Sequence, residues 1–401
     1  MNKNKIIIAS AGSGKTRTLV EEAILIAKKF PNKNVLITTF TEANEQSIKN
    51  KIIQKTGGYI PENIIVQTRF SFLLEHGVKP FQSELDDDLW GKNVGFCFVD
   101  KKSAQKFDET GKAITFISSE GKENPIYWGE NENFNKHYFN SNFQIYSDKI
   151  SKFVIRCDKK TKEEKKDIGI IIERISKIFS HIFIDEVQDL AGYDLEILKL
   201  LFKSESNILL VGDPRQGTYS TNNSAKNKKY ARSQIINFFE DETLIKGLEI
   251  DDKSLTINYR CNDKICSFSN KIFPNLKQTT SDQNFITGHD GVFVIREKDI
   301  DEYLKRNSSC MQLREKITTK GVREKYNVMN FGESKGLDFE RILIYPTEPI
   351  KKWIKENRSE LAPTSRSKFY VAVTRAKYSV AIVYDFANEE ILEGIEKYLL
   401  S

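Results

Sequence analysis

Short runs of β-branched and other apolar residues recur along the first half of the chain, each followed by a turn or an amphipathic stretch. They lie at residues 6–8, 35–40, 64–67, 182–184 and 208–211. Near-continuous apolar strands of this kind are typical of a parallel sheet that helices cover on both faces. After Thr16 the apolar positions recur with helical spacing as far as Pro31, where a helix must end. A strand, a glycine-containing turn and a helix are therefore expected near the N-terminus.

The same alternation returns in the second half, at residues 255–257, 292–295, 342–345 and 379–384. It predicts a second α/β unit, although no sequence repeat relates the two halves. Between them, residues 76 to about 175 show no strand periodicity and carry scattered aromatic residues. We interpret this stretch as an inserted, mainly helical subdomain. Its charged run at 158–167 is expected to be a solvated helix face or loop, with nucleic-acid contact as the alternative.

Composition and charge narrow the possible functions only slightly. The 401 residues include 62 basic and 56 acidic side chains, a net charge of +6, which permits a polyanionic partner without requiring one. The five cysteines form no CxxC pair and the four histidines have no ligand spacing, so we expect reduced thiols and no zinc site. Because no run of about 18 apolar residues occurs, we expect a cytoplasmic protein without a membrane segment.

The segment IIIASAGSGKT at residues 6–16 has the order of a phosphate-binding turn between a strand and a helix. In such a turn the backbone N–H groups point at the phosphates, the lysine neutralises the β- and γ-oxygens, and the hydroxyl ligates Mg²⁺. The strict pattern has glycine where this chain has Ala9, so the match is to the variant AxxGxGKT. A chance match in a loop is the alternative, which the flanking strand and helix disfavour. The residues expected to bind the triphosphate are Ala11, Gly12, Ser13, Gly14, Lys15 and Thr16.

Two adjacent carboxylates, Asp185 and Glu186, follow the apolar strand at 182–184. The ends of strands are where α/β sheets place their chemistry. We expect Asp185, together with Thr16, to hold Mg²⁺, and Glu186 to orient or deprotonate the attacking water. Another strand ends before Gln216, whose side-chain amide is placed to sense the γ-phosphate. An acidic pair alone is a weak signal, but it becomes strong together with the phosphate turn.

In this order the motifs resemble those of the UvrD/Rep-type helicases of superfamily 1. After AxxGxGKT come DExQD at 185–189, GDxxQxxY at 212–219, NYR at 258–260, ESKGLDF at 333–339 and FYVAVTRA at 369–376. The resemblance implies an α/β protein with two RecA-like, parallel-sheet lobes. The first is expected at 1–75 and 176–250, interrupted by the subdomain at 76–175. The second is expected at 251–401, with a reduced or absent insertion around 270–325.

The same resemblance implies ATP and Mg²⁺ as cofactors and assigns several nucleotide contacts. Tyr259 is expected to stack on the base, Arg260 and Arg375 to act as arginine fingers, and Asp338 to contact the nucleotide. Familiar members carry a glutamine-bearing adenine motif before the phosphate turn, and only five residues precede the first strand here. We expect Arg17 together with Tyr259 to hold the adenine in place of that motif.

Contacts with a DNA strand are also implied by the resemblance. The implied residues are Phe40, Thr41, Thr68, Arg69, Phe70, Tyr219 and Lys335. Each phenylalanine has a place in the core as its alternative. The aromatic residue that usually follows Tyr219 is replaced by the segment STNN at 220–223, so we expect coupling to DNA that is weaker or rearranged.

The predicted function is a single-stranded-DNA-stimulated ATPase that translocates on or unwinds DNA, with 3′–5′ polarity by family precedent. The alternative is an ATP-gated DNA-sensing subunit that regulates a partner nuclease, as in Gabija-like anti-phage systems. Housekeeping repair is the rival of a defence role. A phosphate-loop ATPase that acts on proteins or small molecules is disfavoured by the later motifs.

Overall fold

The computed structural model describes residues 4–222, 224–241, 243, 245–356 and 360–399. They form two compact units, which are described separately. The first comprises the residues up to Lys5 with Leu19–Leu210 and Tyr219–Glu249. The second comprises Ile6–Thr18, Val211–Thr218 and the residues from Ile250 onward. The phosphate turn therefore belongs to the same compact unit as the C-terminal motifs, whereas the predicted domain limits assign it to the first lobe.

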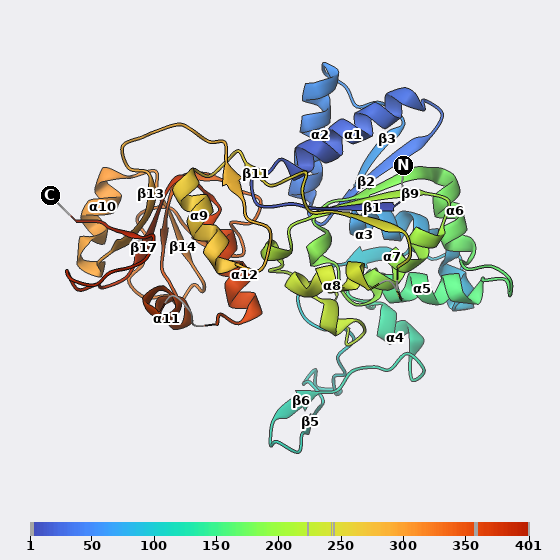
Figure 1. Ribbon diagram of the computed structural model, residues 1–401. Coiled ribbons are helices and arrows are strands. Elements are labelled where there is room, and N and C mark those ends of the chain that lie inside the picture. Colours follow the sequence, from blue (N-terminus) through green and yellow to red (C-terminus); the bar gives the residue numbers. More distant parts are fainter. Residues whose placement is uncertain (1–3, 223, 242, 244, 357–359, 400–401) are drawn as a thin grey trace. The chain divides into compact units, whose positions relative to one another are not determined.

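The first large sheet contains all five strands predicted from the first half of the chain. Its order is β10-β1-β9-β8-β2-β3 (Figure 1). The strands are β1 (Asn4–Ile8), β2 (Asn34–Thr39), β3 (Ile64–Thr68), β8 (Phe179–Ile184), β9 (Asn207–Gly212) and β10 (Leu248–Asp251). Strand β2 runs parallel to β3 and β8, and β8 runs parallel to β9. The expected parallel sheet is confirmed.

The helix after the phosphate turn is also confirmed, because α1 (Lys15–Lys29) ends just before Pro31 and buries one apolar face. Helix α2 (Glu42–Thr56) begins at the capping residue Thr41 and ends at Gly57 in the left-handed conformation. The further helices of the first unit are α3 (Arg69–Leu73), α4 (Phe134–Tyr138), α5 (Ile150–Lys160), α6 (Ile170–Ile178), α7 (Tyr193–Lys203) and α8 (Ile235–Glu240).

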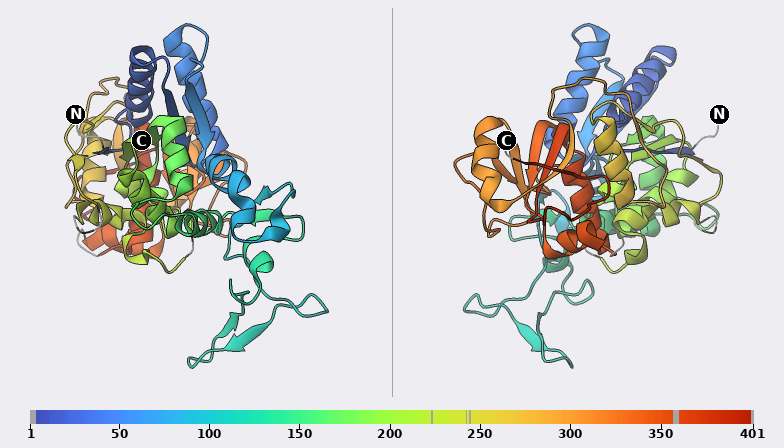
Figure 2. Two further views of the ribbon diagram at one scale, coloured as in Figure 1. Left: turned by 90° about the vertical axis from the view of Figure 1, so that its right-hand side faces the viewer. Right: turned by 60° about the vertical axis from the view of Figure 1, so that its left-hand side comes forward.

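The inserted stretch is less helical than predicted. Residues 90–133, all of them described, contain no helix. Strand β4 (Gly95–Cys97) pairs with β7 (Gln144–Tyr146), while β5 (Thr115–Ile117) and β6 (Glu123–Pro125) form a hairpin that extends away from α4 and α5 (Figures 1 and 2). Turns with Gly111 and Gly121 in the left-handed region reverse the chain here, which explains why the helical expectation failed.

The second unit is built on another six-stranded sheet, in the order β15-β14-β16-β17-β13-β18. Its strands are β13 (Gly291–Ile295), β14 (Met311–Arg314), β15 (Val328–Asn330), β16 (Phe339–Ile344), β17 (Ala376–Val383) and β18 (Glu396–Lys397). All of its pairings are parallel. The two parallel sheets confirm the α/β class. One expectation was wrong: the run at 255–257 contributes only to β11 (Ile257–Asn258), which pairs with β12 (Thr280–Ser281) in a separate small sheet.

Helices cover both faces of this second sheet. Side chains from α9 (Asp263–Ile272), α11 (Glu348–Glu356) and α12 (Pro363–Val373) share one core with Ile342, Ile344 and Val380. Side chains from α10 (Ile300–Arg306) share another core with Leu343 and Ala381. This alternation along β16 and β17 is the two-residue period of strands buried on both faces. Residues 291–314, within the predicted insertion, supply β13, α10 and β14 and are part of the sheet layer itself.

Within the described ranges, every helix is too short or too polar to span a bilayer.

Candidate functional site

The phosphate turn lies between β1 and the first residue of α1, as predicted. Gly12 and Gly14 have φ angles of 70° and 86°, in the left-handed region that a residue without Cβ adopts readily. Lys15 opens α1, and its Nζ donates a hydrogen bond of 3.2 Å to the carbonyl oxygen of Ser10. The Ser13 hydroxyl donates to the same carbonyl at 2.8 Å. The turn therefore holds Lys15 over its own backbone.

The segment at 258–260 contacts this turn directly, within the second unit. The backbone N–H of Tyr259 donates to the carbonyl oxygen of Gly12 at 3.0 Å. The Asn258 carboxamide oxygen accepts from the backbone N–H groups of Arg260 (2.7 Å) and Cys261 (2.9 Å), which fixes the loop. Sequence reasoning assigned no role to Asn258, although it stands inside a motif that was recognised.

A third contact comes from Tyr370 of α12, which sequence reasoning also missed. Its hydroxyl oxygen accepts a hydrogen bond of 3.3 Å from the backbone N–H of Ala11. Ala11 and Tyr370 belong to one apolar core. Burial raises the pKa of Tyr370, so its hydroxyl stays neutral. The turn is thus anchored within the second unit by both backbone and side-chain contacts.

Gly12→Ala is expected to destabilise the protein more than Gly14→Ala. A Cβ at Gly12 would lie 2.3 Å from the Asn258 carboxamide oxygen, whereas at Gly14 no heavy atom within the described structure lies within 4 Å. Both substitutions place alanine in the left-handed region, which costs about 1 to 2 kcal/mol, so the difference between them isolates the clash. Chemical denaturation without nucleotide measures this difference, and equal losses would contradict the contact.

The two predicted arginine fingers occupy different environments within the second unit. The Arg260 guanidinium donates to the carbonyl oxygen of Thr374 at 3.1 Å and lies 3.4 Å from the Asp338 carboxylate. Lys377 approaches the same carboxylate at 3.5 Å. Asp338, predicted as a nucleotide contact, therefore stands between two cations. The side chain of Tyr259 beside Arg260 is 56% exposed, as a base-stacking ring requires.

Arg375 is buried instead. Its guanidinium donates to the carbonyl oxygens of Val371 (3.2 Å) and Leu337 (3.2 Å) and to the side-chain oxygen of Gln216 (3.1 Å). Gln216 in turn donates to the Asp213 carboxylate at 2.8 Å. The predicted γ-phosphate sensor and this arginine are therefore hydrogen-bonded to each other, which no spacing in the sequence reveals.

The acidic pair lies in the first unit, at the end of β8. The backbone N–H of Asp185 donates to the carbonyl oxygen of Thr38 at 2.9 Å, and its carboxylate accepts from the backbone N–H of Glu186 at 2.9 Å. Glu186 has φ 55° and ψ 41°, a left-handed conformation that is unusual for a residue with a Cβ. Such strain is found preferentially at functional sites. Gln188 donates to the Glu186 carboxylate.

The predicted magnesium ligands fit that ion by their chemistry. Thr16 offers a hydroxyl oxygen and Asp185 a carboxylate oxygen, which are hard donors of the kind Mg²⁺ prefers. Arg17, proposed as an adenine contact, has an exposed side chain.

The residues predicted to contact a DNA strand differ in their surroundings. Thr41 and Thr68 each cap a helix, accepting from the backbone N–H groups of Asn44 and Ser71. Tyr219 is exposed and Lys335 half-buried.

Aromatic rings cluster around Phe70 in the first unit. Phe70 is only 6% exposed, and its ring centroid lies 5.7 Å from that of Phe40 and 4.9 Å from that of Phe96. Phe98, whose ring lies 6.2 Å from Phe70, is the exposed member of the cluster. Sequence reasoning missed Phe96 and Phe98; the alternating aromatic pair FCF at 96–98 was the available signal. Phe70 is a core residue, which was the alternative interpretation of its position in the sequence.

Arg69 requires a correction. It was predicted to contact a strand phosphate, but it is 7% exposed and its guanidinium lies 2.6 Å from the Asp194 carboxylate. Arg69 is the first residue of α3, directly after the capping residue Thr68, and its side chain lies inside the first unit. Burial lowers the pKa of Arg69 and the charge of Asp194 opposes that shift, so the guanidinium stays charged. A direct phosphate contact does not fit this placement.

Two family models match large parts of the chain. Residues 1–222 match an AAA domain, and residues 139–384 match the viral superfamily 1 RNA helicase core domain. The chain belongs to the superfamily 1 helicases. Its relatives include a probable DNA helicase II homolog and a Rep helicase. This superfamily 1 helicase is therefore of the UvrD/Rep type, which its motifs resemble.

One relative is a probable DNA helicase II homolog of Mycoplasma pneumoniae, 25% identical over 67% of this chain and 39% of its own length. The ATP-dependent DNA helicase Rep of Buchnera aphidicola is 24% identical over 67% of this chain and 42% of its own length. A probable DNA helicase of Mycoplasma pneumoniae is 22% identical over 95% of this chain and 80% of its own length. The chain thus spans about two fifths of the first two relatives.

Proposed function

We propose that this superfamily 1 helicase is a Mg²⁺-dependent ATPase that single-stranded DNA stimulates and that translocates on or unwinds DNA with 3′–5′ polarity. One observation carries the proposal: the phosphate turn with Lys15 is hydrogen-bonded, within one compact unit, to the segment that bears Tyr259 and Arg260. A lysine, a set of backbone N–H groups and an arginine around one glycine turn suit the negative charges of a triphosphate.

The roles follow from the chemistry of each side chain. Lys15 neutralises the β- and γ-oxygens, and Glu186 orients the attacking water. Arg260 stabilises the charge that develops on the transferred phosphoryl group. Arg375 and Gln216 act as a hydrogen-bonded pair that responds to the γ-phosphate. Thr16 and Asp185 would hold Mg²⁺, which would supply neutralisation of the phosphate charge when it is bound.

DNA binding is assigned to the aromatic cluster and the helix caps of the first unit. A base that stacks on Phe40 or on the exposed Phe98 gains about 1 to 3 kcal/mol without sequence preference. The cap hydroxyls of Thr41 and Thr68, with Tyr219, complete the proposed contacts of the first unit, and Lys335 is the proposed contact of the second unit.

A second candidate is an ATP-gated DNA-sensing subunit that regulates a partner nuclease, as in Gabija-like defence. It is favoured by the segment after Tyr219, where Thr221 and Asn222 are buried at the positions from which relatives are expected to offer an aromatic ring to DNA. Without that ring, hydrolysis can respond to DNA while strand separation fails. Repair and defence remain rival settings for either function.

The test is an ATPase assay with and without single-stranded DNA, combined with unwinding of 3′-tailed and 5′-tailed duplexes. We expect stimulation by single strands and separation of the 3′-tailed duplex alone. Strand affinity should fall with salt at a log–log slope of about −0.7 per neutralised phosphate. Stimulation without unwinding would favour the sensing subunit, and no stimulation would contradict both candidates.

A further inference from the structure

We propose that Arg69 and Asp194 form a buried positioning pair that transmits DNA binding at the aromatic cluster to the acidic pair, Asp185 and Glu186, at the end of β8. This inference rests on the proposed DNA-stimulated ATPase. The pair lies wholly within the first unit. It joins α3, which carries Phe70, to α7, the helix that follows Asp185 and Glu186 in the chain.

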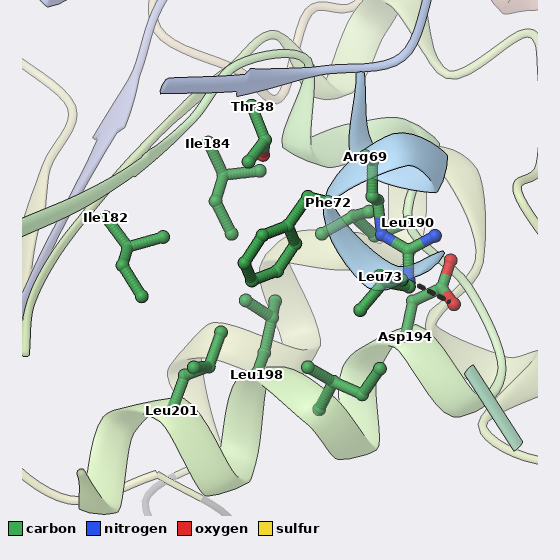
Figure 3. A pocket seen from close by; sticks show the side chains of 11 residues that line it. Thr38, Arg69, Phe72, Leu73, Ile182, Ile184, Leu190, Asp194, Leu198 and Leu201 are labelled. Atoms are coloured by element: carbon green, nitrogen blue, oxygen red, sulfur yellow. Dashed lines mark ion pairs between the residues drawn. The ribbon is translucent and has the colours of Figure 1, made fainter. Parts of the chain in front are cut away.

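The ion pair is close and shielded from water. The Arg69 Nη2 atom lies 2.6 Å from an Asp194 carboxylate oxygen and donates to the Ser151 hydroxyl of α5 at 2.9 Å. Figure 3 shows the guanidinium of α3 directed at the Asp194 carboxylate of α7. A movement of α3 therefore pulls on α7 through two charges that cannot separate without leaving each other uncompensated.

Asp194 is linked in turn to the backbone beside the acidic pair. Its carboxylate accepts a hydrogen bond from the Thr221 hydroxyl. The Thr221 hydroxyl accepts from the backbone N–H of Ala191 at 3.1 Å, and the Thr221 N–H donates to the carbonyl oxygen of Asp189 at 2.8 Å. Thr221 thus holds the segment between Glu186 and α7 at Asp189 and at Ala191.

Asn222 extends this network to the inserted subdomain. Its side-chain nitrogen donates to the carbonyl oxygen of Asp148 at 3.2 Å. Its carboxamide oxygen would lie 2.8 Å from a Cβ at Gly192, the residue that caps α7 with φ 59°. The polar segment at 220–222 therefore has a packing role that an aromatic side chain could not perform.

The pair has room to change its arrangement. A cavity of about 20 Å³, about the size of a single water site, lies beside it. Thr38, Phe72, Ile184 and Leu198 line the cavity together with Arg69 and Asp194 (Figure 3). Among the described residues, the Arg69 Nη1 atom has no hydrogen-bond partner. The small void and the unused donor leave the guanidinium space for a small shift.

The experiment compares wild type with the double variant Arg69→Met/Asp194→Leu, which removes both charges together so that neither is left buried alone. The matched control is Lys199→Met/Glu196→Leu, which removes a 2.6 Å ion pair on the same helix α7. The readouts are the ATPase rate with and without single-stranded DNA, and the affinity for that DNA with and without a non-hydrolysable ATP analogue. The full chain is used throughout.

We expect the double variant to hydrolyse ATP without DNA at the rate of the control. Its stimulation by DNA should be lost, and the change in DNA affinity caused by the analogue, typically about 5- to 150-fold for coupled sites, should fall close to one. The single variant Arg69→Lys keeps the positive charge, so we expect it to retain most of the coupling that the double variant loses. A purely structural role would lower all rates together and would not be rescued in this way.

Thr221→Val serves as a milder second variant should the double variant fold poorly, because it removes only the hydroxyl that bridges Asp194 and Ala191. It should reduce stimulation in a folded protein. If DNA stimulates wild type, and stimulates folded Thr221→Val or the folded double variant to the same extent, the positioning pair is overturned. The proposed function would stand. Absence of stimulation in wild type would overturn the proposed function and the pair with it.

Discussion

Arg260→Ala is expected to lower the maximal ATPase rate by about 10³- to 10⁵-fold, because an arginine finger neutralises charge that develops only in the transition state. The rate should be measured at saturating ATP and single-stranded DNA, with nucleotide affinity measured separately. Arg260 suits this test because, among the residues that the structure describes, its guanidinium makes one backbone hydrogen bond of 3.1 Å and an ion pair with Asp338 at 3.4 Å. Its removal should therefore leave the fold intact.

Lys377→Ala is the matched control for this prediction. Lys377 approaches the same Asp338 carboxylate at 3.5 Å, so its loss disturbs Asp338 in a comparable way without removing the finger. We expect a change of less than about tenfold in the control, equivalent to about 1.4 kcal/mol. Similar losses in both variants would assign Arg260 to the support of Asp338 rather than to the chemistry.

Arg375 is less suitable for such a test. It is buried, and it donates to two backbone carbonyl groups and to Gln216. Replacing it removes three hydrogen bonds to oxygen acceptors around it, which costs stability as well as activity. A loss of rate in Arg375→Ala would therefore not separate catalysis from folding.

Glu186→Gln is expected to lower turnover by about 10²- to 10⁴-fold, the range typical of a general base, while ATP still binds. Glutamine has nearly the same shape, so the left-handed backbone at this position, with φ 55°, is strained to the same degree in both proteins. The difference then reports the carboxylate itself. Single-turnover hydrolysis and binding of a fluorescent ATP analogue are the two measurements.

Glu196→Gln provides the comparison, because Glu196 lies on α7 with a lysine partner at 2.6 Å and outside the proposed chemistry. Its turnover should stay close to wild type. Turnover by Glu186→Gln at the rate of this control would remove Glu186 from the proposed mechanism, and loss of ATP binding would indicate a role in the nucleotide site instead.

The parts of the fold that the sequence predicted well are those with a local signal. The apolar runs of β2, β8 and β9 are buried on both faces, so they stand out as continuous hydrophobic stretches. Strands β14 and β15 were missed because they are short and include polar residues such as Gln312 and Arg314, which are buried through side-chain hydrogen bonds. The hairpin β5–β6 was missed for a similar reason, since its strands are largely exposed.

The candidate site could likewise be predicted only where its residues lie close together in the sequence. The phosphate turn and the acidic pair are contiguous in sequence, and their glycines and carboxylates have recognisable spacing. The partners that hold them are remote: Tyr370 contacts Ala11 across 359 positions and Arg375 contacts Gln216 across 159. Arg69 illustrates the converse, because its motif position predicted a phosphate contact while its actual partner, Asp194, is set by the packing of α3 on α7. Only the folded chain reveals such pairs.

The central claim is that a triphosphate binds at the turn around Lys15 and is hydrolysed in response to DNA. The most direct test is the steady-state rate of ATP hydrolysis by the wild-type protein with Mg²⁺, measured with and without single-stranded DNA, with Lys15→Ala as the background. We predict a rate that single strands raise severalfold and that Lys15→Ala reduces to the background. Hydrolysis that persists in Lys15→Ala, or that is indifferent to DNA, would contradict the claim.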